Sequence, residues 1–241
     1  MDVVGYGHMD AYVNAWTYRA LRNAAPLLGT LGDESLSDRC REAAARLREA
    51  FPKYLVNPKT GWIAGWRSRD GQLHDYAFLW VNGPGLAFGL LSPAAARKAL
   101  IGLEHLREKH GPPGAYCGLP ANLLPIHPDD HMLPKYRSPI LPTFETYTDG
   151  SLMACGMGYY LRALSIHGLR KRARALAEAL DQGFAGGVFC GPYGSGREFH
   201  TWDGLDSGYE GTFGPSFGML YAIAVETAAL QPPEPEWWPE N

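Results

Sequence analysis

The chain has 241 residues, of which 46% are apolar and 12% aromatic, and it carries a net charge of −3. A chain of this size and composition can bury a substantial hydrophobic core. Lysine and arginine are scattered along it, so the sequence lacks the basic patch of a protein that binds nucleic acid or an anionic membrane. We therefore expect a small, neutral or mildly polar substrate as the partner, and neither nucleic acid nor membrane.

Cysteine spacing and the N-terminal segment narrow the class further. The four cysteines are far apart and form neither a CxxC pair nor a zinc-like spacing with histidine, so we expect free, buried thiols and no metal or other cofactor. The N-terminal residues lack the basic and apolar regions of a signal peptide, and no stretch reaches the length of a membrane span. The resulting expectation is a cytoplasmic protein.

Two helices are predicted first along the chain. Small and apolar residues recur at three- and four-residue steps over residues 10–28, and glycines follow this run. A second amphipathic helix is predicted from an N-cap at Ser35 or Ser37 to the turn at Asn57-Pro58. Together they indicate an antiparallel helical hairpin.

The middle of the chain alternates helices with loops. Residues 57–80 carry turn dipeptides and two aromatic-rich pieces, which predict a loop or small β-hairpin. Residues 82–91 predict a buried, closely packed helix, and Ser92-Pro93 opens another helix that runs to His110. The Pro-rich residues 111–148 form a long loop, which in a compact domain is commonly functional.

The C-terminal part repeats the pattern. We expect helices over residues 149–167 and 168–182, a Gly-rich segment, a last helix over 215–230 and a Pro-rich tail. The predicted fold class is all-α, a toroid of (α/α) helical hairpins with small β-hairpins in the loops at one end. One helical domain would cover residues 1–231, and the tail would cover 232–241.

The Gly-rich segment carries the chemistry most typical of a sugar site. Glu198 and Glu210 lie among glycines, aromatic residues, Asp203 and Asp206. Glycines permit tight turns, aromatic faces pack against the apolar face of a pyranose, and a carboxylate can activate water. The plainer interpretation is a surface loop with solvated acids.

Four stretches give the chain a resemblance to a known family: the run DAYVNAWTYRALRNAAPLLG, the NPKTG turn, the run DGSLMACGMGYYLRALSIHG, and Glu198-Phe199-His200 followed by Phe217-Gly218-Met219. They resemble the C-terminal half of six-hairpin, (α/α)6-barrel glycoside hydrolases, in particular the clan of trehalases, processing α-glucosidases and mannosylglycerate hydrolases. The resemblance implies an incomplete (α/α)6 barrel that cleaves an α-linked gluco- or manno-configured glycoside.

The same resemblance implies an inverting mechanism with Glu198 as the catalytic base. Inversion needs a second, protonated carboxyl group roughly 6.5–9.5 Å away. The family's acid is an Asp in a Trp-Asp motif that this chain does not hold securely, and Asp10 or Asp2 is the nearest remnant. A complete barrel needs on the order of 350 residues, so a missing N-terminal half or a homo-oligomer could complete the site. Glu210 remains the alternative base.

Further residues are candidates for substrate contact, each beside a plainer interpretation. Asp149 is most simply a helix N-cap, Glu145 a solvated loop acid, and Trp62 and Trp66 packing residues beside the NPKTG turn. The HPDDH stretch at residues 127–131 could suggest a metal site, but hydrogen bonding within the loop is the preferred interpretation. The full set of substrate-binding candidates is Trp62, Trp66, His74, Asp75, Trp80, Glu145, Tyr147, Asp149, His200, Trp202 and Tyr209.

Two other functions stay open from the sequence. Sugar epimerases with the same barrel use paired histidines as proton carriers, and this chain has His74, His127, His131 and His200 in predicted loops. A non-catalytic carbohydrate-binding fragment is the other alternative, and it is favoured if no acid lies within reach of Glu198.

Overall fold

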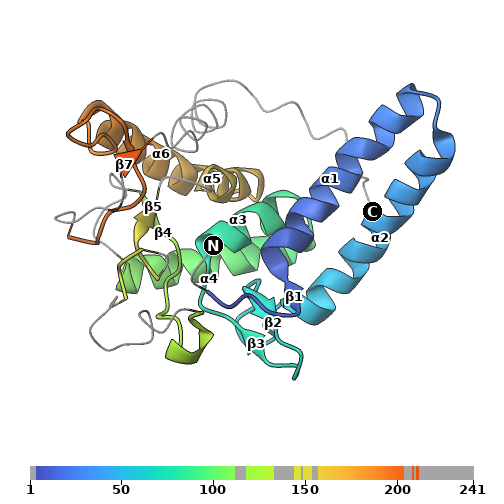
Figure 1. Ribbon diagram of the computed structural model, residues 1–241, viewed down its shortest axis with the longest axis horizontal. Helices are drawn as coiled ribbons and strands as arrows, with labels where there is room; N and C mark the ends of the chain where they lie inside the picture. Colours follow the sequence, from blue (N-terminus) through green and yellow to red (C-terminus); the bar gives the residue numbers. More distant parts are fainter. Residues whose placement is uncertain are drawn as a thin grey trace.

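The computed structural model describes residues 4–111, 118–132, 144–147, 149–153, 157–203, 208 and 210–211. Within these residues the fold is mostly helical, with six α-helices and several short antiparallel strand pairs (Figure 1). None of the described helices combines the length and apolar character needed to cross a bilayer. The predicted helix over 215–230 and the tail lie outside the described residues.

The first helical hairpin was predicted correctly. Helices α1 (Ala11–Thr30) and α2 (Glu34–Leu55) pack against each other and project to one side of the molecule (Figure 1). Asp10 and Asp33 cap them by accepting hydrogen bonds from Val13 and Leu36 backbone N–H groups. The predicted cap at Ser35 or Ser37 is therefore wrong, and the buried Ser37 hydroxyl instead donates to the carbonyl of Ala25 at 2.7 Å.

The remaining helices pack in a row. Helix α3 (Leu79–Ala87) lies between α1 and α5 (Met157–Ile166), and α5 also contacts α6 (Arg170–Ala185) and α4 (Pro93–His110). At Gly83 a Cβ atom would lie 2.7 Å from the backbone nitrogen of Tyr160, so glycine allows α3 and α5 to approach closely. The described helices form the row α2–α1–α3–α5–α6 and do not themselves show a closed barrel.

Two predicted helix starts differ from the structure. Helix α3 begins at Leu79, earlier than expected, while α5 begins only at Met157 rather than near Asp149. The residues before α5 form strand β5 (Leu152–Met153), whose backbone pairs with β4 (Leu119–Pro120). Nonlocal hydrogen bonding therefore replaces the helical turns that the sequence pattern favoured.

Short antiparallel pairings connect the loops that precede the helices. Strand β1 (Met9–Asp10) pairs with β2 (Trp66–Arg67), which pairs with β3 (Leu73–His74), and β6 (Gly196–Arg197) pairs with β7 (Glu210–Gly211). Isolated bridges join residues 78 to 122 and 152 to 200, and a 3-10 turn covers Pro128–Asp130. We call the joined segments, residues 9–10, 66–78, 119–131, 144–147, 149–153 and 196–202, the rim.

The rim places the N-terminal ends of α1, α3 and α5 along one continuous line of backbone pairing. The successive residue pairs are Asp10↔Trp66, Trp66↔His74, Phe78↔Asn122, Pro120↔Leu152 and Leu152↔His200. Beneath this line lies one apolar core, which includes Phe51, Phe78, Leu100, Leu103 and Leu161. The core fixes the helices, and the rim gathers the polar residues that precede them.

Two of the four cysteines are described, and both are free thiols. Cys40 is half-buried and Cys190 is exposed, so the prediction of buried thiols is wrong for this pair. Cys117 and Cys155 lie outside the described residues.

Candidate functional site

Asp149 is the buried centre of the rim. One of its carboxylate oxygens accepts hydrogen bonds from the Asn122 side-chain amide at 2.9 Å and from the Ile126 backbone N–H at 3.0 Å. The other lies 3.9 Å from Nε2 of His131. Burial raises the pKa of Asp149, even though these neighbours favour its charged form. The N-cap interpretation of Asp149 is wrong, because helix α5 begins at Met157 and these contacts tie together rim segments instead.

His74 lies next to Asp149 along the rim. Its ring stacks on Trp66, with the centroids 4.5 Å apart and the planes at 8°, and its Nδ1 is 2.7 Å from Oδ2 of Asp130. The Tyr76 hydroxyl donates to the same carboxylate oxygen. Asp130 contacts His74 and the next residue, His131, faces Asp149. One short turn of the chain therefore connects His74 to Asp149.

These contacts account for the HPDDH stretch. Asp130 pairs with His74 and His131 faces Asp149, while His127 and Asp129 are exposed. Hydrogen bonding within the loops, the preferred interpretation, is present at Asp130. Among the described residues, no three or more metal-ligating side chains come together.

Asp75 anchors the NPKTG turn. One carboxylate oxygen accepts from the Asn57 amide at 2.9 Å and the Thr60 hydroxyl at 3.1 Å, and the other accepts from the Ala77 backbone N–H at 3.1 Å. Burial raises the pKa of Asp75. With both oxygens occupied, this carboxylate fastens the turn to the start of α3.

The segment around Glu198 lies beside residues 144–153. Leu152 and His200 exchange two backbone hydrogen bonds of 2.8 and 2.9 Å, and the indole N–H of Trp202 donates to the Gly150 carbonyl at 2.6 Å. The rings of Tyr147 and Phe199 lie 5.6 Å apart. The structure thus brings Glu198, His200 and Trp202 together with Glu145, Tyr147 and Asp149, as one group of the predicted site residues.

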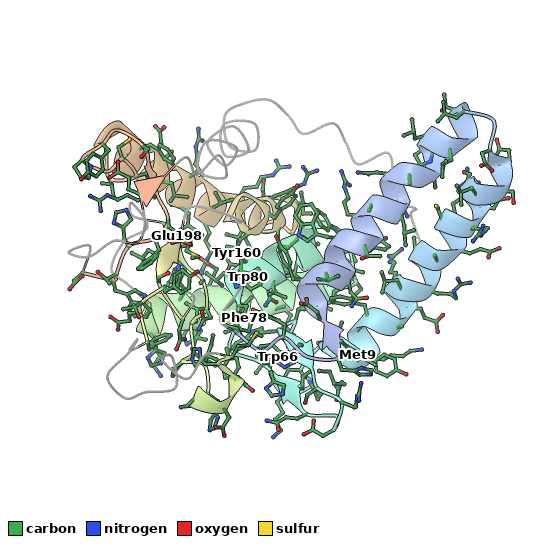
Figure 2. The ribbon with its side chains drawn as sticks, in the orientation of Figure 1. Met9, Trp66, Phe78, Trp80, Tyr160 and Glu198 are labelled. Atoms are coloured by element: carbon green, nitrogen blue, oxygen red, sulfur yellow. The ribbon has the colours of Figure 1, made fainter. Side chains whose placement is uncertain are left out.

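Glu198 is half-buried, and Figure 2 shows it on the side of the rim next to β5 and β7. Met9, the neighbour of Asp10, lies at the opposite end of the rim in the same view. Asp10 caps α1 at 2.9 Å from the Val13 nitrogen, and burial raises its pKa. Tyr209 lies outside the described residues.

Glu210 is held by its own loop. One carboxylate oxygen accepts hydrogen bonds from the backbone N–H groups of Tyr193 and Ser195 and from the Ser195 hydroxyl, at 2.9, 3.1 and 3.1 Å. The other oxygen lies close to the backbone of Gly191. A Cβ atom on residue 191 would overlap this oxygen, so glycine leaves room for the carboxylate there. These contacts give Glu210 a structural role in closing the loop of residues 191–195.

The four candidate histidines each have different partners. His74 engages Trp66 and Asp130, His131 faces Asp149, and His127 is exposed and accepts from the Asp129 backbone N–H. His200 lies 6.1 Å from the Phe189 ring, and burial lowers its pKa. These placements do not single out a pair of histidines for proton transfer.

A row of aromatic rings crosses the inner helices next to the rim. Its members, taken in order of contact, are Tyr6, Trp80, Tyr12, Trp16, Tyr159 and Phe88. Successive centroids lie 5.8, 4.6, 6.0, 5.1 and 5.1 Å apart. The row joins α1, α3 and α5, and Figure 2 shows Trp80 between Phe78 and Tyr160. We call these six residues the aromatic row.

Three polar atoms of the aromatic row have no hydrogen-bond partner within the part of the chain that the structure describes. The hydroxyl of Tyr6 and the indole nitrogens of Trp16 and Trp80 are buried, and none has a hydrogen-bond partner among the described residues. A buried donor without a hydrogen bond is costly, so these three donors, which no described residue pairs, are candidates for binding water or a ligand. The sequence predicts substrate contact for Trp80, is equally consistent with the site or the core for Trp16 and Tyr18, and does not single out Tyr6, Tyr12 or Tyr159. The four-residue step from Tyr12 to Trp16 was the available signal.

The other predicted tryptophans have packing roles. Trp66 is almost fully buried beneath His74. The indole of Trp62 lies against Gly102 of α4, where an added Cβ atom would be 2.9 Å from the indole nitrogen. Tyr18, which the sequence also left undecided, belongs to the core. Neither Trp62 nor Trp66 is a member of the aromatic row.

Backbone strain also gathers on the rim. Of the residues that the structure describes, three besides glycines have positive φ: Ala77 at 53°, Glu145 at 87° and Tyr147 at 44°. Such conformations cost conformational free energy and tend to cluster at functional sites. All three lie in segments that flank Asp149 or His74, so strain and buried polar groups coincide.

Comparison with known proteins gives the fold and no more. No protein-family model matches the chain, and no curated protein matches it in sequence. The fold is similar to part of a solved structure named "Sialidase", with a TM-score of 0.63 and 12% sequence identity. The similarity covers 90% of this chain and 19% of the sialidase chain. This chain therefore spans about a fifth of the length of that protein and shares the fold of that part.

Proposed function

We propose that this chain hydrolyses an α-linked gluco- or manno-configured glycoside by an inverting mechanism, with Glu198 as the catalytic base. The observation that carries the proposal is the aromatic row, whose three buried donors have no partner among the described residues, next to a rim that bears several carboxylates. Proteins bind sugars through aromatic rings and polar groups, because the C–H faces of a sugar pack on aromatic rings and its hydroxyls form hydrogen bonds with the polar groups.

The contacts of Glu210 argue against this residue as the catalytic base. Three donors occupy one oxygen of Glu210, and the other oxygen lies close to the backbone of Gly191, so this carboxylate is held in its own loop. Glu198 is half-buried on the segment that pairs with β5. A base that activates water needs an ionised carboxylate with an accessible oxygen.

The fold neighbour supports the same class of chemistry. A protein named "Sialidase" acts, by its name, on a carbohydrate, and its fold covers most of this chain. Because shared fold does not fix function, the support from this likeness is secondary to the site itself. The substrate and mechanism rest on the rim and the aromatic row.

The test is a panel of α-linked substrates. The chain is incubated with 4-nitrophenyl α-glucoside, 4-nitrophenyl α-mannoside, trehalose and mannosylglycerate, and the first sugar anomer released is identified by proton NMR. The proposal predicts that the sugar whose anomeric carbon is attacked appears as the β-anomer. Trehalose should therefore give equal amounts of β-glucose and α-glucose, because its leaving glucose keeps the α configuration. Release of the α-anomer from the other three substrates would contradict inversion, and binding of these sugars without turnover would identify a non-catalytic carbohydrate-binding chain.

A further inference from the structure

The rim contains a second glutamate, Glu145, on a segment that packs against the segment of Glu198. Five carboxylates near the site are engaged by structural hydrogen bonds through at least one oxygen: Asp10, Asp75, Asp130, Asp149 and Glu210. Glu145 differs from them, because it is half-buried and no described residue donates a hydrogen bond to its carboxylate. An acid that must approach a substrate oxygen needs this freedom.

Glu145 lies on the segment that packs against the segment of Glu198. Phe144, the preceding residue, has its ring 5.3 Å from the Trp202 ring, and Tyr147 lies 5.6 Å from Phe199. The Trp202 indole N–H also donates to the Gly150 carbonyl, which lies after Glu145 in the chain. This hydrogen bond holds the segment of Glu145 to the segment of Glu198. The two glutamates are therefore on neighbouring segments held together at three points.

The backbone at Glu145 adopts a conformation that is unfavourable for a residue other than glycine. Its φ is 87°, and the turn is closed by hydrogen bonds from the Glu145 nitrogen to the Asp149 carbonyl at 2.7 Å and from the Asp149 nitrogen to the Thr146 carbonyl at 3.0 Å. Glycine adopts this φ without penalty. A glutamate here points to a use for its side chain.

From this geometry we infer that Glu145 is the general acid that partners Glu198, an inference that rests on the proposed hydrolase function. The Glu145 carboxyl gives its proton to the glycosidic oxygen as the bond from that oxygen to the anomeric carbon breaks. Water attacks the anomeric carbon from the opposite face and gives a proton to Glu198. Glu145 then regains a proton from solvent and Glu198 releases one.

Leaving groups of different basicity test this role. Fluoride is a weakly basic leaving group and departs without full proton transfer. The sugar oxygen of trehalose and the alkyl oxygen of a methyl glycoside are more basic and need a proton from the general acid in order to leave. Wild type, Glu145→Gln and Glu198→Gln are compared on α-glucosyl or α-mannosyl fluoride and on methyl α-glucoside, methyl α-mannoside and trehalose. The exposed Glu178 on α6, outside the rim and the aromatic row, supplies the matched control, Glu178→Gln, which should retain wild-type rates on every substrate.

Glu145→Gln should lose about 10²- to 10⁴-fold in kcat/KM on the methyl glycosides and trehalose, and less than about tenfold on the fluorides. Glu198→Gln should lose activity on both substrate types. Equal losses on both types for Glu145→Gln, or no loss on either, would overturn the acid role while leaving the hydrolase intact. A wild type inert toward all of these substrates would overturn both proposals.

A second substitution separates chemistry from folding. Glu145→Gly relieves the strained φ, so its thermal midpoint should equal or exceed that of the wild type while its trehalose or methyl glycoside turnover falls as in Glu145→Gln. Full turnover in this variant would overturn the inference.

Discussion

Replacing Trp80 or Trp16 by Phe tests whether the unpaired donors of the aromatic row serve the substrate. The change keeps a ring in the row and removes one buried indole N–H. An unpaired buried donor costs about 1–3 kcal/mol, and the smaller ring forfeits packing of similar size. We therefore expect the free energy of unfolding to change by less than about 1 kcal/mol in either direction.

Substrate binding should respond differently from stability. A hydrogen bond from the indole to a sugar hydroxyl contributes about 0.5–1.5 kcal/mol, so its loss should raise KM by about 2- to 13-fold. Ring stacking is retained in these variants, which limits the effect to this range. The two measurements are KM for the substrate found in the glycoside panel and the unfolding free energy from urea titration.

Trp62 provides the matched control for this experiment. Its indole nitrogen is also buried without a partner among the described residues, but it packs against α4 at Gly102 rather than in the aromatic row. Trp62→Phe should therefore leave KM unchanged. If Trp62→Phe raised KM as much as Trp80→Phe, or if Trp80→Phe and Trp16→Phe left KM unchanged, the assignment of the row to substrate binding would be refuted.

Two predictions concern stability. Glu104 is fully buried and pairs with Arg107 at 2.9 Å and with the Tyr160 hydroxyl at 2.9 Å, so Glu104→Gln should cost about 3–5 kcal/mol in urea unfolding. The exposed Glu108 is the control, and Glu108→Gln should cost less than about 1 kcal/mol. Equal losses of stability in the two variants would contradict the stabilising role given to the buried Glu104 pair. Burial lowers the pKa of His167 and His200 below 6.5, so the unfolded chain takes up protons first as the pH falls. The contribution of these two histidines to the free energy of unfolding is constant above about pH 6.5. It decreases as the pH falls from about 6.5 toward their pKa in the folded state. His167→Asn should therefore make the loss of stability between about pH 6.5 and 5 shallower, and an unchanged slope would contradict this account.

Helix periodicity predicted the hairpin of α1 and α2 because that information is local. Small residues at Ala11, Ala15 and Ala25 repeat at the helical period and are all buried. The start of α5 was not predictable in the same way. Residues 149–153 fit a helical pattern, but their backbone pairs with residues 119–121 and 200, which only the tertiary fold brings near.

The candidate site was predictable as a set of residue types and not as a set of roles. The sequence singled out Asp75, Asp149 and Glu210 as carboxylates in polar loops, but their hydrogen-bond partners come from segments up to 27 residues away. Which oxygen is occupied depends on that pairing. The aromatic row is distributed over three helices, so no single stretch of sequence displays it.

The central claim is that Glu198 activates the water that cleaves the glycoside, and one comparison tests it most directly. Turnover of the panel substrate is measured for the wild type, Glu198→Gln and Glu210→Gln, with circular dichroism to confirm that each variant is folded. The account predicts a loss of at least about 10²-fold for Glu198→Gln and retained turnover for folded Glu210→Gln. Wild-type turnover in Glu198→Gln would contradict it.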